Sequence, residues 1–325
     1  MPFKSLPRNS VHRALNALGD RWSQLIIREA FWGASQFGDF HDRCGMARST
    51  LANRLKALVK NGILEQRPLK RGMARQDYHL TPRGRGLFDY VMLAWGWGVK
   101  WGMVSPGAAT TLVHADCGKA MLPEMHCEQC HGRITMRECT YTPGPGAGTE
   151  RVPVQRMHRR RYPDEREMTF EVVDITGDRW TALVISTQYF GIHRFDDIQS
   201  YLGIATNILT DRLRALEANG IVERRLYDLV PPRYEYWLTK KGMDTYQHSL
   251  SLMLWGDEWL KDPKGPPLYI RHKPCGHRLG AAVVCGECKQ PLQLEAVTVG
   301  RAKIATKPEA ASAKPPRGTR KRVAR

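Results

Sequence analysis

The chain has 325 residues, of which 42% are hydrophobic and 25% charged, so it is long enough for about two domains with packed cores. No run of about 18 apolar residues exists and no apolar segment follows the first lysine, so we expect neither a membrane-spanning helix nor a secretory signal, and a cytoplasmic location. The formal net charge of +18 favours a polyanionic partner, nucleic acid first.

Three helices are predicted in the first part of the chain. Asp20 can cap the first of them, whose apolar residues then share one face and which ends at Gly33. A short helix follows around residues 36–43. The third helix covers residues 48–60, has leucines at helical spacing, and ends before an Asn-Gly pair.

Residues 63–69 and 76–81 are predicted to form a hairpin around a basic turn, with Gly72 at its tip, and a final helix begins near Pro82. The order helix, helix, helix, hairpin, helix is typical of a winged helix-turn-helix. In that fold the second of the paired helices enters the major groove and the hairpin, or wing, contacts the DNA backbone or minor groove. We therefore expect a mainly α chain with small β-hairpins, of the α+β class.

A segment with three cysteines and two histidines follows the last helix. His114, Cys117, Cys127 and Cys130 have the spacing His-x2-Cys-x9-Cys-x2-Cys. Four soft or borderline ligands suit a tetrahedral zinc ion, and four protein ligands leave no position for catalysis, so we expect a structural zinc-ribbon-like module. Disulfides, redox chemistry of the Cys-x2-Cys pair, and chance retention of the cysteines are the alternatives.

The whole pattern recurs at a constant offset of 158 residues. Gly19-Asp20-Arg21-Trp22 returns as Gly177-Asp178-Arg179-Trp180, and the quartet returns as His272, Cys275, Cys285 and Cys288. The chain therefore contains a duplicated unit. The expected parts are winged helix-turn-helix domains at 10–105 and 168–263, Cys/His modules at 111–139 and 268–299, a linker at 140–165, and a disordered basic tail at 300–325.

Three groups of motifs resemble the HxlR family of bacterial winged-helix transcriptional regulators. They are "LGDRW" and "TGDRW", "RLKALVKNGIL" and "RLRALEANGIV", and the wing string "YDLVPPRYEYWLT" at 227–239. The first copy departs from that wing string but keeps its final Tyr-x-Leu-Thr. The resemblance covers 10–105 and 168–263 and implies DNA binding. Family members act as homodimers on palindromic operators, so this chain would carry its own pseudo-dimer.

Some family members sense oxidants through a cysteine just before the first helix. That position falls at Asn9 or Ser10 here, and at Glu167 or Met168 in the second copy, so thiol sensing there is not supported. Cys44 has no counterpart in the second copy, and we expect an inert buried thiol. The tryptophans of each last helix are expected in the core or at an interface between the copies, with a ligand pocket as the alternative.

The expected DNA contacts lie on the outer face of each recognition helix and on the wings. They are Arg48, Ser49, Thr50, Asn53, Arg54, Lys56, Lys70, Arg71 and Arg75 in the first copy, and Thr206, Asn207, Thr210, Arg212, Arg214 and Arg233 in the second. Residues 47–62 carry a net charge of +4, whereas the matching residues 205–220 carry none. We therefore expect the first copy to be the main DNA reader.

The sequence thus predicts a regulator bound to double-stranded DNA, with two structural Zn²⁺ sites. The runner-up is a metal- or redox-responsive switch in which the quartets control DNA binding. An enzyme is disfavoured because no nucleophile–base pair, phosphate loop or open metal site is evident, and RNA binding because no aromatic stacking platform is expected. A homodimer of whole chains and a small-molecule effector stay open.

Overall fold

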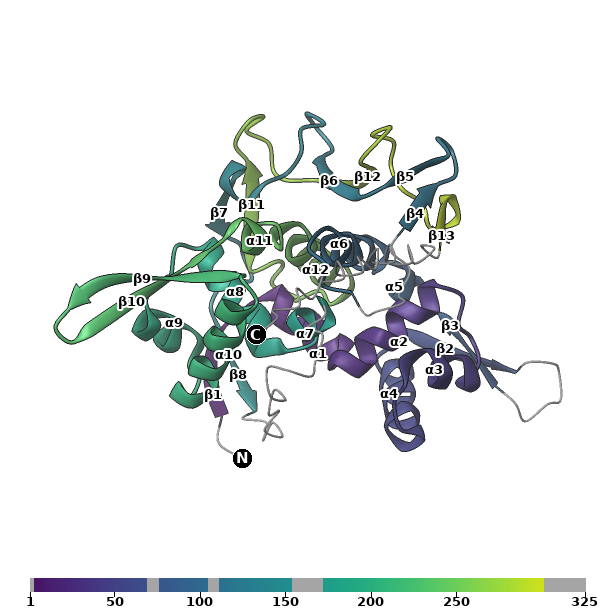
Figure 1. Ribbon diagram of the computed structural model, residues 1–325, viewed down its shortest axis with the longest axis horizontal. Coiled ribbons are helices and arrows are strands. Elements are labelled where there is room, and N and C mark those ends of the chain that lie inside the picture. The colour runs from purple at the N-terminus through teal and green to yellow at the C-terminus, as the bar shows by residue number, and fades with distance from the viewer. Residues whose placement is uncertain (1–2, 69–75, 105–110, 154–171, 301–325) are drawn as a thin grey trace, which may run out of the picture.

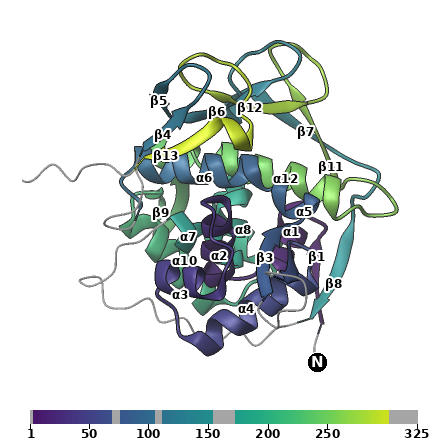
Figure 2. The same ribbon diagram turned by 90° about the vertical axis from the view of Figure 1, so that its right-hand side faces the viewer.

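The computed structural model describes residues 3–68, 76–104, 111–153 and 172–300 (Figure 1). Two winged helix-turn-helix units lie side by side, and the Cys/His segments form a layer across one face of the pair (Figures 1 and 2). In the described ranges, no helix is both long enough and apolar enough to cross a lipid bilayer.

The first unit has the predicted elements, with one helix added at its start. These are α1 (Ser10–Leu18), α2 (Arg21–Phe31), α3 (Phe37–Cys44), α4 (Arg48–Lys60), β2 (Leu64–Pro68), β3 (Gln76–Leu80), α5 (Pro82–Arg85) and α6 (Phe88–Lys100). The predicted helix at 48–60 is α4 with unchanged bounds. The helix predicted from Pro82 is divided into α5 and α6.

The second unit repeats this order. Its elements are α7 (Val172–Thr176), α8 (Arg179–Tyr189), α9 (Phe195–Leu202), α10 (Thr206–Ala218), β9 (Val222–Leu229), β10 (Pro232–Leu238), α11 (Lys240–Met243) and α12 (Tyr246–Trp259). Strands β2 and β3 pair antiparallel, as do β9 and β10, and each pair forms a wing that projects away from the centre of the molecule (Figure 1).

The repeated Tyr-x-Leu-Thr motif joins each wing to the helix after it. The Thr81 side chain caps α5 by accepting a hydrogen bond from the Gly84 N–H at 3.0 Å, and Thr239 accepts from Gly242 at 3.2 Å. A Cβ atom at either glycine would collide with a backbone carbonyl oxygen, that of Ile63 in the first copy. Both glycines are therefore required for the close contact between helix and wing.

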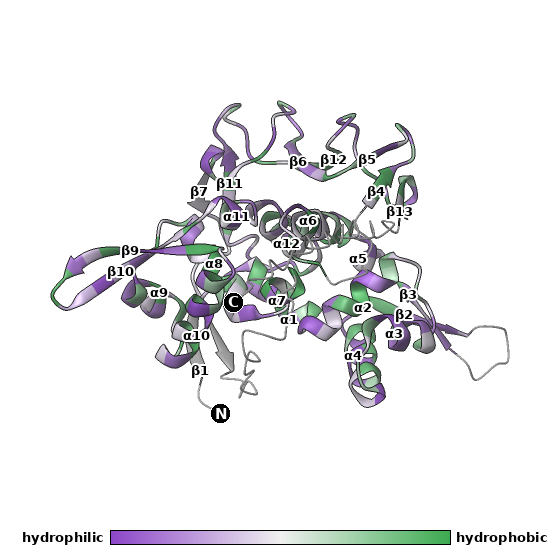
Figure 3. Cartoon of the chain, viewed as in Figure 1, coloured by the Kyte–Doolittle hydropathy of each residue, from purple (hydrophilic) through white to green (hydrophobic). Residues whose placement is uncertain are grey.

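The two units pack through the helices α1, α6 and α12, which carry many apolar residues and lie at the centre of the molecule (Figure 3). The Trp97 indole N–H donates to the Lys241 carbonyl at 3.0 Å, and its counterpart Trp255 donates to the Arg83 carbonyl at 3.0 Å. Both side chains are at most 4% exposed. The prediction of a tryptophan interface between the copies is confirmed.

The arginine of each Gly-Asp-Arg-Trp motif reaches into the other copy. Arg21 forms an ion pair with Asp174 at 2.7 Å, and its counterpart Arg179 donates to the Asn16 side chain at 3.2 Å. Asp174 and Asn16 occupy matching positions of the two copies. The motif therefore serves the interface as well as the helix that it begins.

The segment predicted as a linker at 140–165 is partly strand. β7 (Cys139–Pro143) and β8 (Thr149–Pro153) lie within or at the start of it, and β8 pairs with β1 (Phe3–Pro7). The Pro/Gly run between β7 and β8 marks a turn rather than the whole connection. Residues 154–171 and the predicted tail at 301–325 lie outside the described residues.

The Cys/His layer is built from strands that alternate between the copies. The first copy contributes β4 (Thr111–His114), β5 (Lys119–Met121), β6 (Pro123–Cys127) and β7, and the second contributes β11 (Leu268–His272), β12 (Ala281–Cys285) and β13 (Val297–Gly300). β6 pairs with β12, β7 with β11 and β4 with β13, in each case across the copies. Met125 faces its own counterpart Val283 at the centre of the β6–β12 pair. The two expected modules therefore form one interleaved layer.

Candidate metal centres and nucleic-acid interface

The eight repeated cysteines and histidines form two clusters. One contains His114, Cys117, Cys285 and Cys288, and the other contains Cys127, Cys130, His272 and Cys275. Within each cluster the four candidate ligand atoms lie within 4.8 Å of one another. Either cluster could hold a metal ion, and each takes its His-x2-Cys pair from one copy and its Cys-x2-Cys pair from the other.

This grouping corrects the sequence-based one, which placed His114, Cys117, Cys127 and Cys130 in a single site. The segment from Cys117 to Cys127 contains β5 and β6, and extended chain covers roughly 3.3 Å per residue. β6 therefore carries Cys127 away from Cys117. Its pairing with β12 then places each Cys-x2-Cys next to the His-x2-Cys of the other copy.

The distances between ligand atoms fit a tetrahedral ion. Cys117 Sγ lies 3.9 Å from Cys285 Sγ, and Cys288 Sγ lies 3.3 Å from His114 Nδ1. In the second cluster, the S–S distance from Cys127 to Cys275 is 3.9 Å, and Cys130 Sγ lies 3.4 Å from a histidine nitrogen. Zinc bonds of about 2.3 Å to sulfur and about 2.0 Å to nitrogen predict edges of about 3.5–3.8 Å in a tetrahedron.

The same geometry disfavours a disulfide. All eight cysteines of the chain are free thiols, and the S–S distances across each cluster are far above the roughly 2.05 Å of a disulfide bond. Hydrogen bonds, the largest from the backbone N–H of Gln290, lower the pKa of the Cys288 thiol to about 7, whereas burial raises the pKa of Cys285 in the same cluster. His114 and His272 are almost fully buried, with Nδ1 directed at cysteine sulfur.

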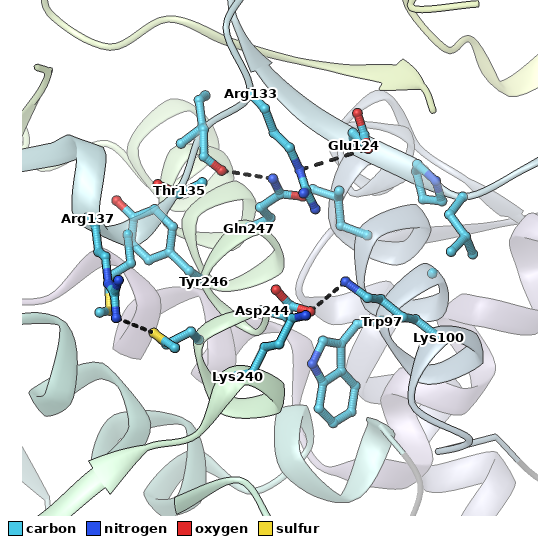
Figure 4. Close-up of a pocket in the computed structure, with 17 residues that line it drawn as sticks. Trp97, Lys100, Glu124, Arg133, Thr135, Arg137, Lys240, Asp244, Tyr246 and Gln247 are labelled. Carbon is cyan, nitrogen blue, oxygen red and sulfur yellow. Dashed lines mark hydrogen bonds and ion pairs between the residues drawn. The ribbon is translucent and has the colours of Figure 1, made fainter. Parts of the chain in front are cut away.

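Direct contacts couple the layer to the helices beneath it. A cleft of about 390 Å³ lies between them, and Lys100 and Asp244, from different copies, form an ion pair at 2.7 Å on its wall (Figure 4). Gln247 of α12 donates to the Ile134 carbonyl at 2.8 Å and accepts from the Met125 N–H at 3.3 Å. A change in the layer would therefore act on α12 directly.

The two recognition helices, α4 and α10, lie away from the Cys/His layer (Figure 1). Arg48, Ser49, Asn53 and Lys56 are exposed on α4, and Thr50 is half-buried. On α10, Thr206, Asn207 and Arg214 are exposed, as is Arg233 on the second wing, whereas Thr210 is half-buried and donates to the Thr206 carbonyl at 2.9 Å. Lys70, Arg71 and Arg75 lie outside the described residues.

Two of the predicted DNA contacts form ion pairs within their own copy. Arg54 forms a bidentate ion pair with Asp20, the residue that caps α2, with its shortest N–O distance at 2.6 Å. Arg212 forms an ion pair with Asp178, the residue that caps α8, and the two side chains are only 8% and 3% exposed. These arginines fix α4 to the start of α2 and α10 to the start of α8. The helical period puts Arg54 and Arg212 next to the outer face, which is why they were predicted as DNA contacts. Nothing in the sequence indicated that the aspartate of the Gly-Asp-Arg-Trp motif would bind them.

The two unmatched cysteines are shielded. Burial and the nearby Glu29 raise the pKa of Cys44 to about 12, and burial raises the pKa of Cys139. Cys44 is half-buried rather than fully buried, but its thiol stays protonated at neutral pH, which agrees with the inert role predicted for it.

The family model described as HxlR-like helix-turn-helix matches residues 17–106 and 175–264. The chain belongs to the HxlR-like helix-turn-helix family. It contains two HxlR domains, and a transcriptional regulator of this family binds DNA.

Relatives and solved structures resemble parts of the chain. An uncharacterized HTH-type transcriptional regulator of Mycobacterium tuberculosis is 37% identical over 134 residues, which are 41% of this chain and 85% of the relative. A Synechocystis regulator described in the same words is 36% identical over 91 residues, 28% of this chain and 67% of the relative. The redox regulator HypR in its reduced form is 33% identical, covers 27% of this chain and 89% of its own, and has a TM-score of 0.26. The reduced form of the transcriptional regulator YodB of Bacillus subtilis is 31% identical, covers 27% of this chain and 87% of its own, and has a TM-score of 0.25.

Proposed function

We propose that the tandem HxlR domains act as a pseudo-dimer on double-stranded DNA, with the first copy as the main reader. The proposal that the first copy is the main reader is supported by the charge on the two recognition helices. Arg48, Lys56 and Lys60 project from α4, and none of them has an ion-pair partner among the described residues. On α10 the corresponding exposed charges are Arg214 and the acidic Asp211.

The second wing has one ion pair without a counterpart in the first. Arg224 lies 3.5 Å from Glu217 of α10, where the first copy has Gln66 and Val59, whereas the Arg225–Glu223 pair is matched by Arg67–Glu65. Phosphate neutralisation by free cations supplies most of the sequence-independent affinity for DNA. The first copy therefore has more charge available for the phosphates, and the second copy suits a weaker or different half-site.

A binding titration tests this ranking. Arg48→Ala in the first copy is compared with Thr206→Ala at the matching position of the second, on DNA recovered by a genomic footprint. Loss of a side chain that contacts a base edge costs about 1–3 kcal/mol, so we expect Arg48→Ala to weaken binding by about fivefold or more and Thr206→Ala much less. Equal losses would contradict the ranking. A footprint with half-sites about one helical turn apart would support the pseudo-dimer.

The two Cys/His clusters are proposed as structural zinc sites. Their ligands would be His114, Cys117, Cys285 and Cys288 in one, and Cys127, Cys130, His272 and Cys275 in the other, because the donor types and spacings suit four-coordinate zinc. Bound zinc would join the copies through cysteine and histidine side chains. Metal analysis should find two zinc ions in the purified protein and one in Cys127→Ser.

A second candidate function is a metal-responsive switch. It is supported by the crossed ligand sets, since loss of metal would release strands of both copies at once and act on α12 through Gln247. DNA affinity measured before and after chelation, with zinc added back, tests it. An unchanged affinity would leave the sites with a structural role alone.

A further inference from the structure

A cavity of about 370 Å³ lies where helices of the second copy meet β7 and the start of α1 of the first copy, and the DNA-binding function does not use it. Its walls come from α8, α9 and α12, from the strands β7 and β11, and from the start of α1. The volume falls in the range of roughly 300–1,000 Å³ that is typical of small-molecule sites. We name it the second-copy cavity, and its principal lining residues are Tyr141, Tyr189, Phe190, Tyr201, Tyr246 and Met253.

The aromatic rings of this cavity are held in fixed edge-to-face pairs. Tyr141 and Phe190 have ring centroids 5.2 Å apart at 75°, and Tyr189 and Tyr246 are 5.1 Å apart at 85°. The Tyr141 hydroxyl donates to the Tyr246 hydroxyl at 2.8 Å, and the Tyr189 hydroxyl lies 3.2 Å from that of Ser249. The walls are therefore aromatic and apolar, with hydroxyl groups at defined points.

The first copy does not have the same lining. At the offset of 158 residues, Met253 corresponds to Trp95, Ser249 to Val91 and Tyr189 to Phe31. Those three residues of the first copy are buried in the apolar core. The second copy therefore has a smaller side chain or an added hydroxyl where the first copy has core packing, which is the pattern expected of a copy adapted to a ligand.

The charge of the lining restricts the ligand. Among the described residues that line the cavity, only Arg8 is charged. It already forms an ion pair with Asp262 at 2.6 Å. Burial raises the pKa of Tyr189 to about 12, so its hydroxyl stays neutral. An ionised ligand would lose its hydration without gaining a counter-charge, whereas a neutral aromatic ring would find matching walls.

We propose that the second-copy cavity binds a small neutral aromatic molecule that carries a hydroxyl or carbonyl oxygen. Such a ligand would contact Tyr201 on α9, the helix next to the recognition helix α10. It would also contact Tyr141 on β7 and Ile270 on β11, two residues before the metal-cluster residue His272. Its position makes it an effector site of the second copy, beyond the DNA contacts and the metal clusters.

The test uses the full chain without DNA, so it is independent of the proposed DNA-binding function. The probe is 2-naphthol, a neutral fluorescent phenol, titrated at neutral pH into the wild type and into Met253→Trp. This variant introduces the residue that the first copy has at the matching position. We expect saturable binding to the wild type and at least about tenfold weaker binding to Met253→Trp, because the indole takes up cavity space.

Controls separate cavity binding from adsorption to the surface. Leu226→Trp adds the same indole on the exposed wing and should leave affinity within about twofold. Ser249→Val, again a first-copy residue, should weaken binding in a protein with an almost unchanged core. The anion 2-naphthoate should bind more weakly than 2-naphthol. Equal affinity of the wild type and both cavity variants, equal binding of the anion, or no saturable binding would overturn the proposal.

Discussion

The two copies share the contacts that hold their helices and wings together, and they differ in surface charge and in the residues that line the cavity. In both, an aspartate caps the second helix and binds an arginine of the recognition helix, and a threonine and a glycine join the wing to the next helix. The Arg54–Asp20 pair is 36% and 43% exposed, however, whereas Arg212–Asp178 is nearly buried. The first copy has the more basic recognition helix, and the aromatic cavity lies mainly against helices of the second. A homodimer imposes every change on both halves, whereas one chain with two copies lets them diverge.

The largest expected effect concerns the layer that both copies build together. Cys117→Ser/Cys285→Ser removes two ligands of one cluster and should leave one zinc ion per chain. Cys117→Ser/Cys127→Ser removes one ligand from each cluster and should leave none. Zinc content by mass spectrometry of the native protein separates the two. The opposite ranking would restore the grouping within each copy.

The two aspartate–arginine pairs should differ sharply in stability. Arg212→Ala leaves Asp178 buried without a counter-charge and should lower the free energy of unfolding by about 3–5 kcal/mol. Arg54→Ala breaks a half-exposed pair and should cost about 1 kcal/mol. Urea denaturation of both variants measures the difference. Similar losses in the two variants would contradict the prediction that the buried pair contributes more to stability than the half-exposed one.

The second copy buries a histidine, His248, at a position where the first copy has a tyrosine. Burial lowers the pKa of His248 to about 3, and its counterpart is Tyr90. The unfolded histidine binds its proton near pH 6.5, so the wild type should lose stability as pH falls below about 6.5. The loss should be about 2 kcal/mol by pH 5. His248→Phe should lose less over this interval. Melting curves at pH 7.5 and pH 5, with zinc supplied equally, compare them, and identical pH dependence would contradict the prediction.

The smallest effect concerns salt. Lys56→Gln should reduce the slope of log affinity against log salt by about 0.9, the value for one phosphate contact. Arg214→Gln, at the matching position of α10, should reduce it by less, because the first copy is proposed to make most phosphate contacts. Titrations at three salt concentrations measure both slopes. A larger reduction in Arg214→Gln would reverse the proposed roles of the copies.

Local features were predictable from the sequence, and contacts between the copies were not. Helical spacing and an Asn-Gly stop predicted α4 to its last residue, Lys60. The offset of the repeats identified all eight candidate ligands. A repeated sequence, however, specifies ligand types and not which copy supplies them, so Cys127 was assigned to the wrong partners. Helix α1 was missed although Asn9 caps it, accepting a hydrogen bond from the Val11 N–H at 2.8 Å.

The alternation of strands in the layer has a consequence for how the chain can be divided. A cut between Pro153 and Val172 would yield two polypeptides, each with a complete helix-turn-helix but only half of every metal cluster and one partner of each crossed strand pair. Such fragments should reassemble when produced together, and the association should depend on zinc. Each fragment would then need the other to complete its Cys/His clusters and its strand pairs.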